Sequence, residues 1–240
     1  PYRAEDRENF TYLMKELRES MDATGKKLLL TFASAGWKKY YDYVDLDEVM
    51  KYADYMNVMT YDAVGGGTPY TALLTNLGWV KPEHLKGTPA ESIIEERDYK
   101  LDPRSAEKII SFCIEKAVDP KQIVIGGAFY GKGWKGVPPD NNGLYQSNTG
   151  PLRNVTYSKI VEEYEDKNGY IRYWDPIAKA PYLYNKEKEE FITYEDKTSI
   201  KLKTEYAKEH GLGGIMFWQL RSDAEKDGLL NAIYEVVSEK

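Results

Sequence analysis

The stretch DYMNVMTYD at residues 54–62 decides the fold, because it reads as a short buried strand that ends in a tyrosine and an aspartate. Three other apolar runs have similar length, namely KKLLLTFASA at 26–35, QIVIGGAFY at 122–130 and GGIMFWQL at 213–220. Segments with an apolar residue every three or four positions separate these runs, as expected of amphipathic helices. Strands that alternate with helices predict parallel crossover connections and therefore an α/β fold.

The helical patterns occur at residues 10–21, 106–117, 198–210 and 229–237. Asp102 and Pro103 predict the start of the second helix, with Asp as the cap and Pro in the first helical position. Cys113 lies on the apolar face of that helix and is expected to be a buried thiol. It is the only cysteine, so a disulfide within the chain is excluded, which fits either a reducing compartment or an exported protein without disulfides.

Two segments do not follow the alternation of helix and strand. Residues 63–101 form a long irregular stretch, and loops of that length are usually functional or disordered. Residues 135–192 begin with the turn-rich GVPPDNNG and continue with the aromatic runs YIRYW, PYLYN and EFITY, which predict antiparallel hairpins. We therefore expect a body at 1–134, an insertion at 135–192, and a last strand with its flanking helices at 193–240.

The composition excludes several classes of function. The formal charge of −6 makes nucleic-acid binding a poor expectation, and no apolar run is long enough to span a bilayer. The charged opening PYRAEDRENF has no apolar core of a targeting sequence, so we expect either a cytoplasmic chain or one whose natural start has been removed. The chain holds 21 Tyr and 5 Trp, which suit either a sugar-binding groove or an aromatic core.

Large aromatic residues recur where the predicted strands end. Met59 and Tyr61 share one face of their strand, and Met216 and Trp218 repeat that pattern in the last strand. Asp62 follows Tyr61 directly. Ligands bind at the carboxyl ends of parallel barrel strands, so these residues predict a shared site, with core packing as the alternative.

The amino-acid sequence of these segments resembles that of glycoside hydrolase family 18, which comprises chitinases and endo-N-acetylglucosaminidases. The resemblance rests on MTYD at 59–62, FYGKGW at 129–134 and GLGGIMFWQL at 211–220. It extends to YWDPIAKAPYLYN at 173–185, which is similar to the α+β insertion of that family, and to the opening residues 1–20.

The resemblance implies a (β/α)₈ TIM barrel, a fold of eight strands and about 250 residues. Only four core strands are present here, so they are expected to be strands five to eight, with the α+β insertion between seven and eight. The family signature Asp-Gly-x-Asp-x-Asp-Trp-Glu, whose Glu donates a proton, is absent from the sequence. The acidic run DYVDLDE at 42–48 imitates it, but we interpret that run as a helix start.

The resemblance also implies roles for individual residues. Tyr61 would orient the acetamido carbonyl of the substrate, which attacks its own anomeric carbon in a substrate-assisted retaining mechanism. Trp218 would form the floor under that sugar. Lys132 stands where the family often has Arg, and it lacks the two-pronged donor geometry of that residue. The remaining expected substrate-binding residues are Asp62, Met59, Tyr130, Trp134 and Met216.

The expected function is hydrolysis of β-1,4-linked N-acetylglucosamine polymers by the intact protein, with no metal or cofactor. This chain alone is expected to be inactive, and a non-catalytic chitinase-like lectin is the alternative. N-glycan or peptidoglycan substrates are a third interpretation. The family suggests a secreted or periplasmic location. The open barrel edges are expected to pair with another copy, with a missing N-terminal piece or with a rearranged segment.

Overall fold

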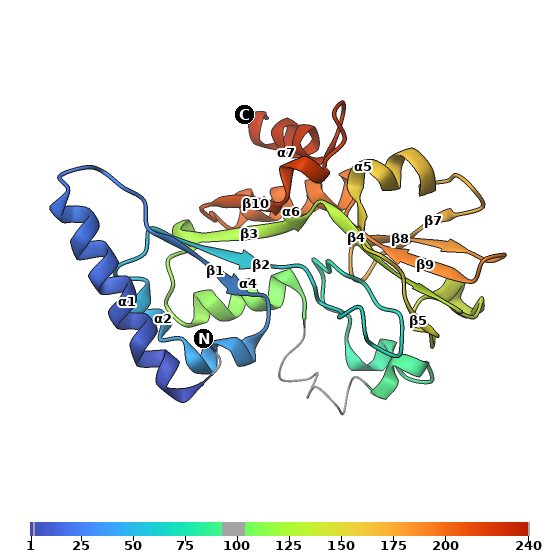
Figure 1. Ribbon diagram of the computed structural model, residues 1–240, viewed down its shortest axis with the longest axis horizontal. Coiled ribbons are helices and arrows are strands. Elements are labelled where there is room, and N and C mark those ends of the chain that lie inside the picture. Colours follow the sequence, from blue (N-terminus) through green and yellow to red (C-terminus); the bar gives the residue numbers. More distant parts are fainter. Residues whose placement is uncertain (2, 93–103, 240) are drawn as a thin grey trace.

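The computed structural model describes residues 1, 3–92 and 104–239, so Asp102 and Pro103 lie outside the described residues. Two β-sheets lie next to each other along the longest axis of the molecule (Figure 1). The first is a parallel sheet in the order β1-β2-β3-β10. Its strands are β1 (Thr31–Ala35), β2 (Tyr55–Met59), β3 (Ile123–Ala128) and β10 (Gly214–Trp218).

All four predicted core strands are therefore confirmed, but β1 begins later than the apolar run at 26–35 suggested. The parallel register pairs Thr31 with Tyr55, the first residue of β2, so no partner strand exists for the residues before Thr31. Leu28 and Leu29 remain exposed there.

Helices cover one face of the parallel sheet. They are α1 (Ala4–Ala23), α2 (Leu46–Val49), α4 (Ala106–Glu115), α6 (Lys197–Glu209) and α7 (Leu229–Ser238). In Figure 1, α1 lies at the β1 side of the body, and α6 with α7 lies at the β10 side. Both α4 and α6 contact β3, and α7 packs mainly on α6. None of the helices in the described ranges combines the length and the apolar character needed to cross a bilayer.

The main core lies between this sheet and α4. Met56, Val58, Ile110 and Cys113 are fully buried within it. The full burial of Cys113 confirms its predicted core position, and this burial raises the pKa of its thiol to about 12. Helix α1 differs from the expectation, because Met14 alone among its apolar residues is buried.

The acidic run at 42–48 starts a short helix, as predicted from its sequence. Helix α2 begins at Leu46, with Asp45 in the cap position. The Asp45 carboxylate lies 3.0 Å from the guanidinium of Arg7 in α1, so this carboxylate joins two helices.

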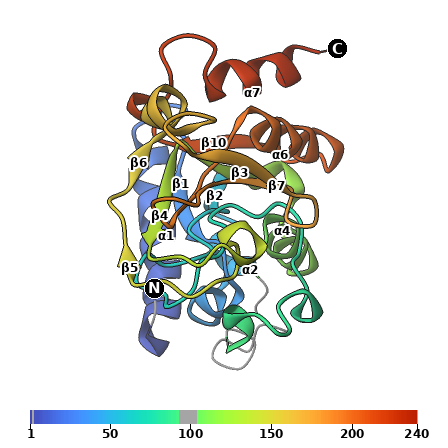
Figure 2. The ribbon, with the colours of Figure 1, turned by 90° about the vertical axis from the view of Figure 1, so that its right-hand side faces the viewer.

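The second sheet is antiparallel and has the order β5-β4-β9-β8-β7, with β6 paired to β4 (Figure 2). Its strands are β4 (Tyr130–Lys135), β5 (Gly150–Pro151), β6 (Val155–Thr156), β7 (Ile171–Asp175), β8 (Ala180–Asn185) and β9 (Glu190–Thr193). A short helix, α5 (Tyr157–Lys159), continues into a π-helical turn at Ile160–Tyr164. The predicted hairpins are confirmed, although this sheet starts at Tyr130, inside the segment expected to belong to the body. The exact division at 134 and 192 stays a prediction.

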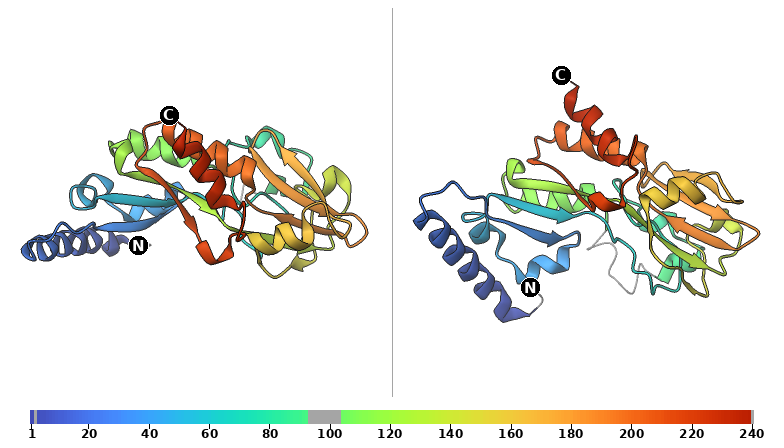
Figure 3. Two further views of the ribbon diagram at one scale, coloured as in Figure 1. Left: turned by 90° about the horizontal axis from the view of Figure 1, so that it is seen from above. Right: turned by 45° about the horizontal axis from the view of Figure 1, so that its top comes forward.

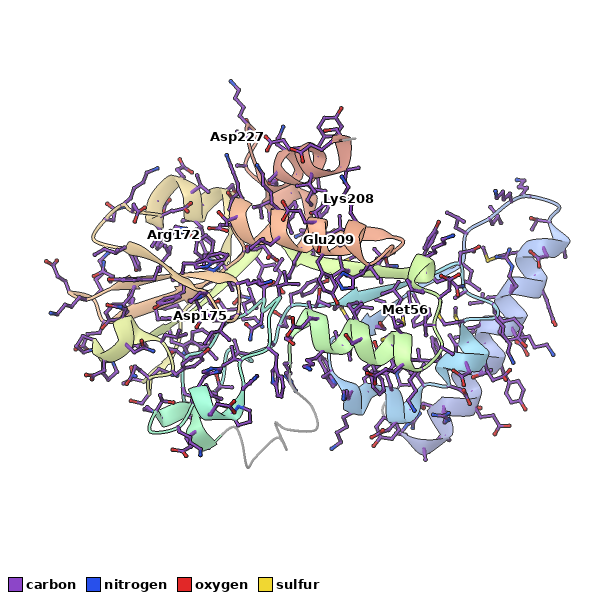
Figure 4. All side chains as sticks on the ribbon, turned by 180° about the vertical axis from the view of Figure 1, so that it is seen from behind. Met56, Arg172, Asp175, Lys208, Glu209 and Asp227 are labelled. Carbon is purple, nitrogen blue, oxygen red and sulfur yellow. The ribbon has the colours of Figure 1, made fainter. Side chains whose placement is uncertain are left out.

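Strand β3 passes almost directly into β4, so one chain segment joins the two sheets (Figure 3). Arg172 and Asp175 of β7 lie on the other side of the molecule's centre from Met56 of β2 (Figure 4). A site at the junction is therefore open to contributions from both sheets.

The parallel sheet is open rather than closed into a barrel. Within the described ranges, β1 pairs only with β2 and β10 pairs only with β3, so each keeps one unpaired edge. No described segment of the chain pairs with these edges, so the expected pairing with a rearranged segment is not observed in the described residues.

Candidate functional site

A cleft of about 560 Å³ opens where the two sheets meet, beyond the carboxyl ends of β2, β3 and β10. Parallel strands bring their carboxyl ends to one edge, which explains why residues far apart in sequence gather there. The described residues that line the cleft are Met59, Tyr61, Asp62, Tyr130, Lys132, Asn154, Val155, Thr156, Trp218, Gln219 and Ser222.

Tyr61 forms the wall next to the end of β2. The Thr60 hydroxyl donates to the Gly126 carbonyl oxygen at 2.7 Å and accepts from the Gly126 N–H at 2.9 Å, so it continues the pairing of β2 with β3. A Cβ at Gly126 would lie 2.8 Å from the Tyr61 ring, so the absence of a side chain there lets the ring pack on β3. Burial raises the pKa of Tyr61 to about 12, with the Asp62 charge adding to the effect.

The Tyr61 hydroxyl has a weak partner in the protein. Its contact is with the sulfur of Met216, at 3.9 Å, and a thioether is a poor acceptor. Met216 therefore lies beside the ring of Tyr61 rather than on the surface of the cleft. This hydroxyl remains able to donate a hydrogen bond to a ligand.

Asp62 connects the two sheets. Its Oδ1 accepts a hydrogen bond of 2.7 Å from the Tyr130 hydroxyl and lies 2.7 Å from the Lys132 ammonium, both on β4. The backbone of Asp62 has φ 58°, in the left-handed region that Asp tolerates better than most residues. Burial and this hydrogen bond to Asp62 raise the pKa of Tyr130. The Lys132 ammonium also donates to the Val64 carbonyl oxygen at 3.3 Å.

Trp218 presents an open aromatic face. Its side chain lies at the end of β10 and is 59% exposed, which is unusual for so large an apolar group. The peptide bond from Trp218 to Gln219 is cis, and the Trp218 carbonyl oxygen accepts a hydrogen bond of 2.8 Å from the Phe129 N–H. The backbone of this tryptophan is thus fixed to the strand that leads into β4.

The structure corrects the expectation for Trp134. Alternation along β4 places it on the same side as Tyr130 and Lys132, but it is fully buried and packs against Phe191. The loop after Asp62 covers it, because the indole N–H donates to the Gly66 carbonyl oxygen at 3.0 Å. A buried indole has no face to offer a sugar, so Trp134 does not line the cleft.

Several lining residues were missed in the sequence. Gln219 and Ser222 follow β10 and could have been found by extending the strand-end argument beyond Trp218. Asn154, Val155 and Thr156 carry no pattern of their own. They reach the cleft because the two-residue strand β6 pairs with Tyr130 and Gly131.

The cleft offers a donor hydroxyl, a flat apolar face and one carboxylate. Of the described residues that line it, only Asp62 carries a carboxylate, and that group already accepts from Tyr130 and Lys132. Such a mixture suits a neutral ligand with both apolar faces and hydrogen-bonding groups, as sugars have. The described part of the chain shows no group of three or more His, Cys, Asp or Glu able to hold a metal ion.

Comparison with known proteins agrees with this geometry. The chain is 34% identical to chitinase A1 of Niallia circulans over 235 residues, which are 93% of this chain and 32% of that protein. A family 18 N-acetylglucosaminidase from Paenibacillus barengoltzii superposes with a TM-score of 0.84 and 35% identity, over 98% of this chain and 65% of that one. A chitinase-like agglutinin from Robinia pseudoacacia superposes with a TM-score of 0.78 and 26% identity, again over 98% and 65%.

The chain thus spans about a third to two thirds of the lengths of these relatives. The model of the family described as "Glycosyl hydrolases family 18" matches residues 1–223. These findings confirm the resemblance seen in the sequence and a TIM-barrel-like α/β fold: the chain belongs to glycosyl hydrolase family 18.

Proposed function

We propose that this chain forms the substrate-orienting side of an enzyme that hydrolyses β-1,4-linked N-acetylglucosamine polymers. The observation that carries the proposal is the convergence of Tyr61, Asp62, Tyr130 and Trp218 on one cleft. The names of its chitinase relatives support the same class of substrate.

The residues fit a substrate-assisted reaction, in which the acetamido oxygen of the substrate attacks its own anomeric carbon. The Tyr61 hydroxyl, whose contact with the Met216 sulfur is weak, donates to that oxygen and holds it in line for attack. Trp218 supports the apolar face of the sugar ring. Asp62, oriented by Tyr130 and Lys132, accepts from a group on the same sugar.

The proton donor for the leaving oxygen lies, in this proposal, outside the cleft described above. Asp62 is a poor candidate, because its Oδ1 is occupied by Tyr130 and Lys132. We propose that β1, β2, β3 and β10 are strands five to eight of a barrel whose remaining part carries the acid. The unpaired edges of β1 and β10 support this, and they would associate with that part or with another copy.

A sugar-binding protein without hydrolytic activity is the second candidate. Two observations favour it: the similarity to an agglutinin, and the presence of a single carboxylate among the described lining residues, whose Oδ1 is already bound by Tyr130 and Lys132. A secreted or periplasmic location stays our prediction in both cases, because a polymer such as chitin is met outside the cell.

Binding and turnover separate these candidates. We expect the 240-residue chain to bind triacetylchitotriose in calorimetry and not to cleave longer oligomers, as followed by mass spectrometry. The Tyr61→Phe variant should fold normally and bind more weakly, since it loses only the donor hydroxyl. Cleavage by the verified chain would contradict its predicted inactivity, and a lack of binding would contradict both candidates. Cleavage by a longer protein that contains the whole barrel would exclude the sugar-binding alternative.

A further inference from the structure

A fully buried ion pair lies behind the cleft. Lys203, on α6, and Glu195, two residues before that helix, are both 0% exposed, and the Lys203 ammonium lies 3.0 Å from Glu195 Oε2. Removing two charges from water carries a large desolvation cost, so such a pair must have compensating partners. Those partners link it to the residues that form the cleft.

The Lys203 ammonium contacts the residue that follows β2 and a residue within β3. It donates to the carbonyl oxygens of Thr60 and Gly126, each at 3.1 Å. Thr60 directly precedes Tyr61, and Gly126 is the position on which the Tyr61 ring packs. The ammonium therefore fixes the backbone just before Tyr61 and the part of β3 on which the Tyr61 ring packs.

Glu195 fixes the next part of the wall. Its Oε2 accepts from the Ala128 N–H at 3.1 Å and from the Thr75 hydroxyl at 2.8 Å. Ala128 ends β3, two residues before Tyr130. Thr75 also accepts a hydrogen bond from Lys203 and belongs to the segment that follows Asp62, so it closes the cluster.

We infer that Lys203, Glu195 and Thr75 are positioning residues that set the relative placement of Tyr61 and Tyr130 in the cleft. The inference rests on the proposed function, because the geometry it protects is that of a sugar-binding wall. None of the three lines the cleft, so they act through the strand ends they hold. A displacement of about 1 Å at such positions is enough to disrupt a productive geometry.

A purely structural pair would behave differently from a positioning pair. Apolar residues of similar volume often replace a buried ion pair without loss of stability. They cannot bond Thr60, Gly126 or Ala128, so the strand ends would relax even in a stable protein. A variant in which apolar residues replace the ion pair should therefore retain its stability and lose affinity for the ligand.

The first test uses the double variant Lys203→Met with Glu195→Leu, with Lys201→Met as the control. Lys201 lies on the same helix and pairs with Glu235 at the surface. We expect the double variant to keep its melting temperature within a few degrees and to bind triacetylchitotriose about tenfold more weakly. The control should match the wild type in both measurements. Wild-type affinity in a stable double variant would overturn the inference.

The second test works even if the double variant does not fold. Thr75→Val removes the central hydroxyl at nearly constant volume, whereas Thr75→Ser retains it. In protein labelled with ¹³C-tyrosine, Thr75→Val should shift the ring resonances of Tyr61 and Tyr130 and leave that of Tyr234, an exposed residue of α7, in place. Thr75→Ser should restore both resonances and the affinity.

Unmoved Tyr61 and Tyr130 resonances in Thr75→Val would refute the positioning role directly. If the wild-type chain does not bind triacetylchitotriose, the proposed function fails. The ring resonances still decide whether the cluster positions the tyrosines, so the two failures are distinguishable.

Discussion

Replacing Trp218 with Ala should weaken sugar binding about 20-fold. A tryptophan side chain presents about 250 Å² when fully accessible. With 59% exposure, about 150 Å² of Trp218 faces the solvent, of which one ring face is about half. Covering about 75 Å² with the apolar face of a sugar contributes about 1.9 kcal/mol at ~25 cal/mol per Å². Each 1.4 kcal/mol corresponds to a tenfold change in Kd, which gives the expected factor.

Calorimetric titration with triacetylchitotriose measures this loss directly. The buried remainder of the Trp218 side chain is about 100 Å², so its removal costs at most about 2.5 kcal/mol of stability. The titration therefore belongs well below the melting temperature, where the variant is still folded. Tyr234→Ala is the matched control, because Tyr234 is 69% exposed on α7 and does not line the cleft.

Two results would refute the reasoning. A wild-type Kd in Trp218→Ala would show that no sugar rests on the indole. Alternatively, Tyr234→Ala could lose affinity by the same factor, and the effect would then belong to exposed aromatic residues in general rather than to this cleft.

Three other outcomes follow from the buried groups. Gly126→Ala should lower both the melting temperature and the sugar affinity, because its Cβ would lie 2.6 Å from a carbonyl oxygen and 2.8 Å from the Tyr61 ring. Gly65→Ala is the control for both measurements, because the space around its Cβ is open. Cys113 should resist a thiol reagent at pH 8 in the native protein and react in denaturant, because it is fully buried and its pKa is raised to about 12. Urea unfolding should show stability falling as the pH rises from about 10 towards 12. Burial raises the pKa of Tyr40 and Tyr61 from 10.0 to about 12, so the folded state retains protons that the unfolded state has lost. Constant stability up to pH 12 would contradict this linkage.

Regular elements could be predicted because the residues that form them repeat at fixed spacing. The apolar runs that became β2 and β10 are each followed by a polar residue, so their ends were visible. The run at 122–130 continues past the end of β3 at Ala128 into the first residue of β4, so that boundary was not visible. The same alternation placed Met59 with Tyr61 and Met216 with Trp218, and the parallel connection brought their strand ends together. Of these four strand-end residues, Met59, Tyr61 and Trp218 line the cleft, whereas Met216 lies beside the ring of Tyr61.

The errors arose where tertiary contacts decide exposure. Trp134 has the alternation of a cleft residue and is nonetheless covered by the loop that carries Gly66, a contact across 68 positions. Leu13 and Leu17 follow the helical period of α1, but they are 50% and 40% exposed because the described chain packs against only one side of that helix. Local spacing cannot report such contacts.

Asp62 shows why the cleft is better understood as a joint between the two sheets than as an edge of either one. Its backbone ends the segment that leaves β2, and its carboxylate takes donors from Tyr130 and Lys132 at the start of β4. Replacing it with Asn would retain a residue that tolerates the left-handed backbone, but would remove the charge that holds the lysine. The wall of the cleft depends on this contact, together with the Lys132–Val64 hydrogen bond and the edge-to-face contact of the Tyr61 and Tyr130 rings. A carboxylate used in this way orients its neighbours and has little freedom to transfer a proton. For this reason we assign Asp62 to holding the substrate and place the acid of the proposed reaction elsewhere.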